Sequence, residues 1–369
     1  QKGLDGVLVD ETAISRVVPE TNSLTYRGYP VQDLCAHCSF EEVAWLLWNG
    51  DLPTRSQLTR FRRDERSRRE LSRDHIAVIR KFPRNAHPMD TIRTAVSYLG
   101  TTETAWGGEG PKNDRRRALD LLAKIPTMIA TDYRFRKGKR RIAPRDDLSM
   151  SENFLWMCFG KVPPKEVVKA FDVSLILYAE HSFNASTFAS RVVTSTMSDM
   201  YSAVTAGIGA LKGPLHGGAN EAVMHMLLEI GQPDKAEAWL RKAFRDRRVV
   251  MGFGHRVYKW GDSRVPTMRK CLEELSAWKN DARWVQIEDV LARIMVDERK
   301  IHPNLNYPAG PAYYLMGFDI DMFTPIFVIS RITGWTAHIM EQDASNRLIR
   351  PLSAYTGVEQ REVKTIATR

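Results

Sequence analysis

The stretch Leu211-Lys-Gly-Pro-Leu-His-Gly-Gly-Ala-Asn-Glu-Ala-Val223 separates two helical segments and leaves a histidine between them. Residues 199–211 predict a helix that ends at Gly213-Pro214, because proline cannot continue a helix. From Val223 onward, apolar residues recur at i, i+3, i+4 and i+7, which is the apolar face of a second helix. The chain around this break is therefore expected to be helical on both sides.

His216 lies in that break and is followed by Gly217 and Gly218. Two successive glycines cost backbone entropy, which favours a site where something approaches the backbone closely. An imidazole near a helix N-terminus faces the positive end of the helix dipole, which favours its neutral form. A neutral imidazole can donate a hydrogen bond to a carbonyl that is becoming an enolate. A hydrogen-bonded histidine at a helix corner is the alternative interpretation.

Length and composition indicate an ordinary globular protein with room for two domains. The chain has 369 residues, 43% hydrophobic and 27% charged. The sequence shows no apolar run near the ~20 residues of a membrane span. Its first residues do not form a charged and apolar leader, and the start at Gln1 leaves open whether residues precede them. Four cysteines favour a reducing compartment over a disulfide framework, so we expect a cytoplasmic protein. Cys35 and Cys38 form a CxxC without a second pair at zinc spacing, so no metal site is predicted.

The formal net charge of +10 suggests an anionic partner. Basic residues cluster at 60–73, 134–145 and 241–256, but acidic residues interrupt the first cluster, as on a solvated helix face. We find neither paired zinc fingers nor an RNP-like strand, so nucleic acid is not the expected partner. A phosphorylated small molecule accounts for the charge equally well.

The remaining pattern predicts a mostly α protein with a short N-terminal β segment. Strands are expected at 6–9 and 23–26, and 101–115 is expected to be a surface loop. Ser39 and Glu42 form a capping box that begins a helix ending at Gly50. Further helices are expected at 90–99, 116–131, 164–180, 185–196, 234–244, 264–276, 281–300 and 325–342.

A second histidine motif is Val250-Met-Gly-Phe-Gly-His-Arg-Val-Tyr258. Its glycines resemble the start of a dinucleotide fingerprint, but position 257 is valine and no parallel strand precedes it. The sequence also has no P-loop, no GxSxG elbow and no HExxH zinc motif. Arg264 follows nine residues after His255, in Gly261-Asp-Ser-Arg-Val-Pro266.

Together these motifs resemble the citrate synthase family, in the branch that contains 2-methylcitrate synthases. The resemblance covers nearly the whole chain. It rests on Thr21-Asn-Ser-Leu-Thr-Tyr-Arg-Gly-Tyr-Pro30, Ala179-Glu-His-Ser-Phe-Asn-Ala-Ser-Thr187, the 213–220 stretch, the His255 motif and the segment from Phe323 to Arg331. It implies a helical homodimer whose subunits have a large domain, 1–218 and 313–369, and a small domain, 219–312.

The resemblance also implies an activity: condensation of a short acyl-CoA with oxaloacetate, followed by thioester hydrolysis. It requires no metal or bound cofactor, because acyl-CoA is a substrate. By family position, His216 hydrogen-bonds the thioester carbonyl and His255 polarises the ketone of oxaloacetate. His181 and the arginines Arg264, Arg331 and Arg350 match the oxaloacetate-binding set, with Arg350 contributed across the dimer. Without the family, surface ion pairing would explain these arginines.

Position 306 departs from the family pattern. The family takes its catalytic base, an aspartate, from a Pro-Asn-Leu-Asp segment, and here the segment reads Pro303-Asn-Leu-Asn306. An amide cannot accept the proton, although it is nearly isosteric with the carboxylate. Three explanations are open: an exchange engineered to trap a ligand complex, a natural paralogue with weak or altered activity, or a sequence error or a rescue by Asp319 or Asp321.

The basic segment 245–259 matches the region where the family holds the phosphates of CoA. Arg256 and Lys259 are the predicted phosphate contacts, with a solvated face as the alternative. The segment Tyr307-Pro-Ala-Gly-Pro-Ala-Tyr-Tyr314 resembles the 2-methylcitrate branch and favours propionyl-CoA over acetyl-CoA. A citrate synthase that uses acetyl-CoA and a non-catalytic binder of CoA and oxaloacetate are the alternatives.

Overall fold

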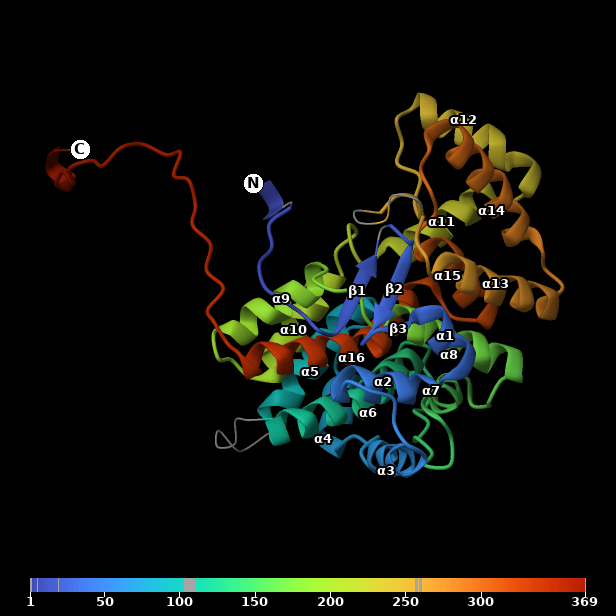
Figure 1. Cartoon of the computed structure of the whole chain (residues 1–369), viewed down its shortest axis with the longest axis horizontal. Helices are drawn as coiled ribbons and strands as arrows, with labels where there is room; N and C mark the ends of the chain where they lie inside the picture. The colour runs from blue at the N-terminus through green and yellow to red at the C-terminus, as the bar shows by residue number, and fades with distance from the viewer. Residues whose placement is uncertain are drawn as a thin grey trace.

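The computed structural model describes residues 2–4, 6–18, 20–102, 111–255, 258 and 261–368, and most of this length is helical (Figure 1). The α-helices are α1 Val31–His37, α2 Phe40–Asn49, α3 Arg55–Arg66, α4 Arg73–Arg80, α5 Pro88–Thr101, α6 Pro111–Arg136, α7 Met150–Phe159, α8 Lys165–Tyr178, α9 Ala185–Ser195, α10 Met200–Leu211, α11 Ala219–Ile230, α12 Ala236–Arg245, α13 Val265–Lys279, α14 Arg283–Ile294, α15 Asn306–Met316 and α16 Phe323–Ala344. The mostly α fold class is confirmed.

Three short antiparallel strands make the β segment, in the order β1-β2-β3. They are β1 Ser15–Val18, β2 Ser23–Tyr26 and β3 Tyr29–Pro30. The strand expected at 23–26 is confirmed, whereas the one expected at 6–9 is wrong. Residues 7–9 have no partner strand among the described residues, and Leu8 is 97% exposed, so the run of valine and leucine has nothing to pack on.

Most predicted helix boundaries hold because the capping chemistry is local. Ser39 and Glu42 form the expected capping box of α2, and Gly50 ends that helix at φ 89°. Asp199 caps α10 through the backbone N–H of Ser202. The loop expected at 101–115 is partly wrong, because α6 begins at Pro111, a residue that suits a first helical turn; residues 103–110 lie outside the described chain.

The core is organised around α16, whose residues 323–339 are all buried. A helix that is apolar on every side belongs inside a protein, and α16 packs against α6, α8, α9 and α10. Figure 1 shows α11 to α15 gathered at the upper right, above the larger group of helices. The predicted domain boundary at 312 falls inside α15, and the division at 218 and 312 stays a prediction.

The chain beyond α16 runs away from the body without a strand or α-helix (Figure 1). Leu352, Val363 and Ile366 on this segment are more than four-fifths exposed.

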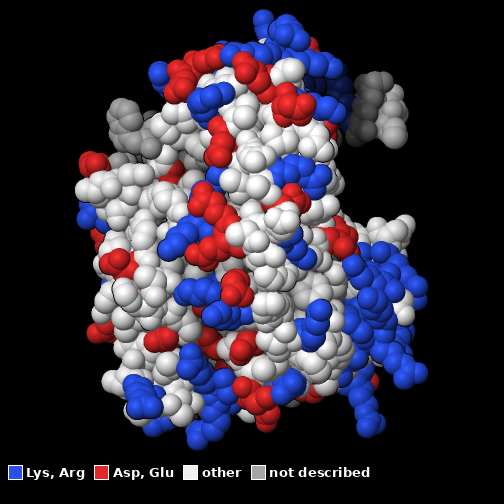
Figure 2. Space-filling view, turned by 90° about the vertical axis from the view of Figure 1, so that its right-hand side faces the viewer, with Lys and Arg blue, Asp and Glu red and all other residues white. Residues whose placement is uncertain are grey.

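Within the described chain, no single helix is long and apolar enough to cross a membrane; α15 and α16 meet that criterion only as a pair, bent by 119°. Figure 2 shows acidic and basic side chains mixed over most of the visible face, with Lys and Arg concentrated at its right-hand edge.

Candidate active site

The C-terminal end of α8 holds two buried arginines through its last carbonyls. The Nε of Arg331 donates to the carbonyl of Tyr178 at 2.7 Å, and Nη1 of Arg264 donates to that of Leu177 at 3.5 Å. The last carbonyls of a helix lack partners within the helix and lie at its negative end, so they favour cations. Arg264 is the N-cap residue of α13 and Arg331 lies within α16, and the end of α8 brings these two predicted residues together.

Arg264 is neutralised within the protein by Asp262. Its Nε and Nη2 donate to the two carboxylate oxygens at 2.9 and 2.7 Å, and both side chains are almost fully buried. Burial alone would raise the pKa of Asp262, but Arg264 lowers it strongly, so the carboxylate stays ionised. Asp262 Oδ2 also accepts the backbone N–H of Leu305 at 3.0 Å. The ion pair therefore fixes the start of α15, where Asn306 lies.

Arg331 is only partly satisfied. It is 2% exposed, and its Nη1 has no hydrogen-bond partner among the described residues. The guanidinium lies 4.7 Å from the centroid of the Phe327 ring. Burial lowers the pKa of Arg331 to about 10, which still leaves it charged at neutral pH. A carboxylate ligand would accept the hydrogen bond that this buried, unpaired donor can give and would balance its charge.

His181, His255 and Tyr258 form a cluster of rings beside this arginine pair. The centroids of the two imidazoles are 5.1 Å apart, and Tyr258 lies 4.7 Å from His255 and 5.6 Å from His181. Burial, with the positive charge of Arg264, lowers the pKa of His255 to about 4 and that of His181 well below its usual value. Both rings are therefore neutral at pH 7.

The proton on His255 can be assigned from its neighbour. The backbone N–H of Tyr258 donates to Nδ1 of His255 at 3.2 Å. Because Nδ1 is then an acceptor, the proton of the neutral ring is on Nε2. Nε2 of His181 is buried and has no partner among the described residues, so this nitrogen has a place for a ligand atom.

His216 lies between α10 and α11, as expected, and is held by the first turn of α9. Its Nε2 accepts the backbone N–H of Ser186 at 3.3 Å and lies 2.8 Å from Ser186 Oγ. The proton of the neutral ring is therefore on Nδ1. Burial, with a contribution from Arg331, lowers the pKa of His216 to about 4. Burial, the larger of these two causes, favours the neutral ring that the sequence suggested.

Asn306 is the first residue of α15 and touches the same group of residues. Tyr178 Oη donates to Asn306 Oδ1 at 2.9 Å. The ring of Phe327 lies 4.3 Å from that of Tyr178 and 6.2 Å from that of His216, measured between centroids. Phe327 and Tyr178 thus connect His216 to the residue in the base position.

A rescue of the missing base by Asp319 or Asp321 is wrong on geometry. Both residues follow the C-terminal end of α15, whereas Asn306 begins the helix. Eleven residues of helix separate its two ends by roughly 16 Å, and Asp319 forms an ion pair with Lys137. Neither carboxylate can reach the acidic C–H of a substrate held beside Asn306.

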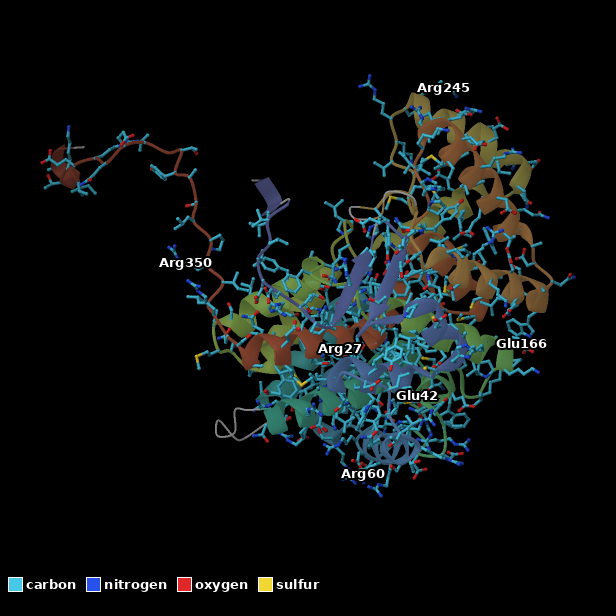
Figure 3. All side chains as sticks on the ribbon, in the orientation of Figure 1. Arg27, Glu42, Arg60, Glu166, Arg245 and Arg350 are labelled. Atoms are coloured by element: carbon cyan, nitrogen blue, oxygen red, sulfur yellow. The ribbon has the colours of Figure 1, made fainter. Side chains whose placement is uncertain are left out.

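Of the predicted site residues, one lies apart from this group and two lie outside the described chain. Arg350 is exposed on the C-terminal segment, away from the helices that carry the other arginines (Figure 3). Arg256 and Lys259, the predicted phosphate contacts, lie outside the described residues. Arg245, the first residue of the predicted basic segment 245–259, ends α12 and is exposed at the upper edge of the group formed by α11 to α15 (Figure 3). For Arg350 the expectation of a role across a dimer is therefore retained.

The sequence did not single out Tyr178, Asp262 or Ser186 as functional. Asp262 lies two residues before Arg264, and Ser186 lies five residues after His181, so both are inside the motifs quoted above. A polar residue this close to a predicted site residue was a signal that could have identified them. Tyr178 has no such signal, because its partner Asn306 lies 128 residues further along the chain.

A pH-dependent stability follows from the pKa of His216. Its value of about 4 in the folded chain lies below the ordinary 6.5, so on acidification the unfolded chain binds this proton first, which destabilises the fold. Relative to His216→Gln, the parent should lose up to ~1.4 kcal/mol of unfolding free energy per pH unit between pH 6.5 and pH 4. Urea unfolding at pH 7, 6 and 5 measures this. A difference that stays constant over that range would contradict the assignment.

With this geometry, the fold and the grouped histidines and arginines define an acyltransferase of one family: the chain belongs to the citrate synthase family. The family model described as "Citrate synthase, C-terminal domain" matches residues 3–352. Members of this family condense an acyl-CoA with oxaloacetate.

Among its relatives, the chain is 59% identical to a 2-methylcitrate synthase of Mycobacterium tuberculosis, over 98% of this chain and 91% of the relative. It is also 59% identical to a citrate synthase of Mycolicibacterium smegmatis, over 98% and 96%. A solved citrate synthase of Thermoplasma acidophilum, a ternary complex with carboxymethyl coenzyme A and oxaloacetate, matches with a TM-score of 0.93 and 33% identity, over 100% of this chain and 99% of that one.

Proposed function

We propose that this chain binds oxaloacetate at the end of α8 and a short acyl-CoA beside His216. The observation that carries the proposal is the pair of buried arginines on the last carbonyls of α8, of which Arg331 keeps an unpaired Nη1. Oxaloacetate has two carboxylates, and planar guanidinium groups suit them. His181 would bind the same ligand. The complex of oxaloacetate with the Thermoplasma acidophilum relative supports this assignment.

The two remaining histidines would act as neutral donors. The Nδ1–H of His216 would hydrogen-bond the thioester carbonyl as it becomes an enolate. The Nε2–H of His255 would polarise the ketone of oxaloacetate and stabilise the alkoxide that forms with the new carbon–carbon bond. The depressed pKa of both rings supports this role, since a neutral imidazole does not protonate the enolate outright.

The preferred acyl group would be propionyl, giving 2-methylcitrate. The support is the resemblance of Tyr307 to Tyr314 to that branch, because relatives of both names are 59% identical. One methyl group in a pocket is worth only ~1–3 kcal/mol. The ratio of kcat/KM for propionyl-CoA to that for acetyl-CoA should exceed one, measured by release of free CoA thiol. A ratio below one would make the chain a citrate synthase instead.

A non-catalytic binder of CoA and oxaloacetate is the second candidate, and Asn306 favours it. It predicts that both ligands raise the melting temperature while no thiol is released.

We further propose that the protein acts as a homodimer in which the exposed C-terminal segment carries Arg350 to the partner's site. Sedimentation velocity tests the dimer, and a monomer at micromolar concentration would contradict it.

Arg331→Met should weaken oxaloacetate binding about 30-fold or more, since removing one partner of a buried charge pair costs ~2–5 kcal/mol. Methionine keeps the apolar stem but removes the unpaired donor. Isothermal titration calorimetry with oxaloacetate measures the change. The matched control is Arg134→Met, because Arg134 also donates to backbone carbonyls, of Cys158 and Arg140, but lies outside this site. Equal affinities in the two variants would remove Arg331 from the binding site.

A further inference from the structure

The segment that carries His181 is held in an unfavourable backbone conformation. His181 lies between Tyr178, where α8 ends, and Ala185, where α9 begins. The next residue, Ser182, has φ 51°, in the left-handed region that residues with a Cβ rarely adopt. Such a conformation persists only where the surrounding structure enforces it. The contacts around residues 180–182 therefore decide where the His181 ring lies.

Two hydroxyl groups of the N-terminal sheet supply those contacts. Ser15 Oγ donates to Glu180 Oε1 at 2.9 Å and accepts the backbone N–H of Ser182 at 2.9 Å, so a single hydroxyl holds the residues on both sides of His181. Tyr26 Oη accepts the backbone N–H of Glu180 at 3.3 Å and lies 3.1 Å from its carbonyl. Ser15 and Tyr26 are opposite each other in the register of β1 and β2, so both side chains project from one face of the sheet.

The opposite side of this segment is closed by α16. Glu180 is fully buried, and its Oε1 also lies 2.8 Å from Nε2 of His338. A Cβ on Gly334 would come within 2.5 Å of the carbonyl of Ala179, so α16 approaches the backbone as closely as glycine allows. With α16 on one side and the two hydroxyls on the other, residues 179–182 have little room to relax.

We propose that Ser15, together with Tyr26, is a positioning residue for His181, and that the three-stranded sheet preorganises the oxaloacetate site. The inference rests on the proposed binding of oxaloacetate by His181. Neither hydroxyl needs to touch the ligand. Removing the Ser15 hydroxyl frees the N–H of Ser182 and leaves Glu180 Oε1 with His338 alone. Ser182 can then leave the left-handed region and move the His181 ring.

Ser15→Ala should weaken oxaloacetate binding roughly tenfold, because a small displacement of a binding group is costly, as measured by calorimetry on the full-length protein. Ser15→Thr keeps a hydroxyl and should restore the affinity to within about threefold of the parent. Ser174→Ala is the matched control, since Ser174 is a fully buried serine on α8 whose Oγ donates to the carbonyl of Phe171. Its affinity for oxaloacetate should equal that of the parent.

A role in stability alone gives a different result. If Ser15→Ala binds oxaloacetate like the parent while its melting temperature falls as in Ser174→Ala, the proposal is wrong. If the parent itself does not bind oxaloacetate, the proposed function fails instead. The NMR signals of the His181 ring then still test whether Ser15 positions that ring. Its imidazole resonances, assigned by their loss in His181→Gln, should shift or broaden in Ser15→Ala but not in Ser174→Ala. Unchanged resonances in Ser15→Ala would overturn the inference.

Discussion

Asn306→Asp is expected to raise the rate of thiol release from propionyl-CoA and oxaloacetate by ~10²–10⁴, the usual contribution of a positioned general base. The amide of Asn306 cannot accept the proton from the carbon beside the thioester, whereas a carboxylate of nearly the same shape can. Tyr178 Oη already donates to the side-chain oxygen of residue 306 at 2.9 Å, so the new carboxylate would be held in place. A thiol reagent that reports free CoA measures the rate.

The control is Asn306→Gln, which keeps an amide and should give no gain. Exchange of the acidic C–H with D₂O, followed by NMR, isolates the deprotonation from the later steps and should appear only in the aspartate form. If the parent releases thiol as fast as Asn306→Asp, another group takes the proton, and the role assigned to position 306 is wrong. If neither form turns over but both bind oxaloacetate, the chain is a binder rather than an enzyme.

Much of the fold was predictable because its signals are local. Ser39 with Glu42, Asp199 and the break at Gly213-Pro214 each define a helix end from neighbouring residues. Helix α15 was not predicted, because Pro308, Gly310 and Pro311 oppose a helix by propensity. Tertiary packing overrides that preference: the Cβ position of Gly310 lies 2.9 Å from the carbonyl of Asn220, so this helix contacts α11 through a residue that has no side chain.

The site was predictable in its histidines and arginines but not in their supports. His216 and His255 occur in glycine-bearing breaks that the sequence marks, and the family resemblance supplied Arg264 and Arg331. The groups that orient them come from distant segments: Tyr178 holds Arg331 across 153 residues and Ser186 holds His216 across 30. A single sequence carries no information on such pairs, because nothing in the residues around Tyr178 specifies which cation packs against its carbonyl.

Asp262→Ala is expected to lower the free energy of unfolding by ~3–5 kcal/mol, the cost of leaving one member of a buried ion pair alone. This carboxylate, which is 3% exposed, accepts three hydrogen bonds from Arg264, one of them from its backbone N–H, and one from the N–H of Leu305. Urea unfolding at pH 7 measures the loss. Glu298→Ala, which breaks the exposed pair with Arg241, is the control and should unfold like the parent.

The double variant Asp262→Ala with Arg264→Met separates the two roles of the pair. If the loss in Asp262→Ala comes from the unpaired guanidinium, removing that charge should recover most of it, because an apolar replacement of a buried ion pair is often neutral. The double variant should then be folded but bind oxaloacetate far more weakly than the parent. A double variant as unstable as Asp262→Ala would instead assign the loss to the N–H of Leu305, and hence to the start of α15. In that case Asp262 serves mainly to hold residue 306 in position. The guanidinium of Arg264 could then bind the ligand without lowering the free energy of unfolding.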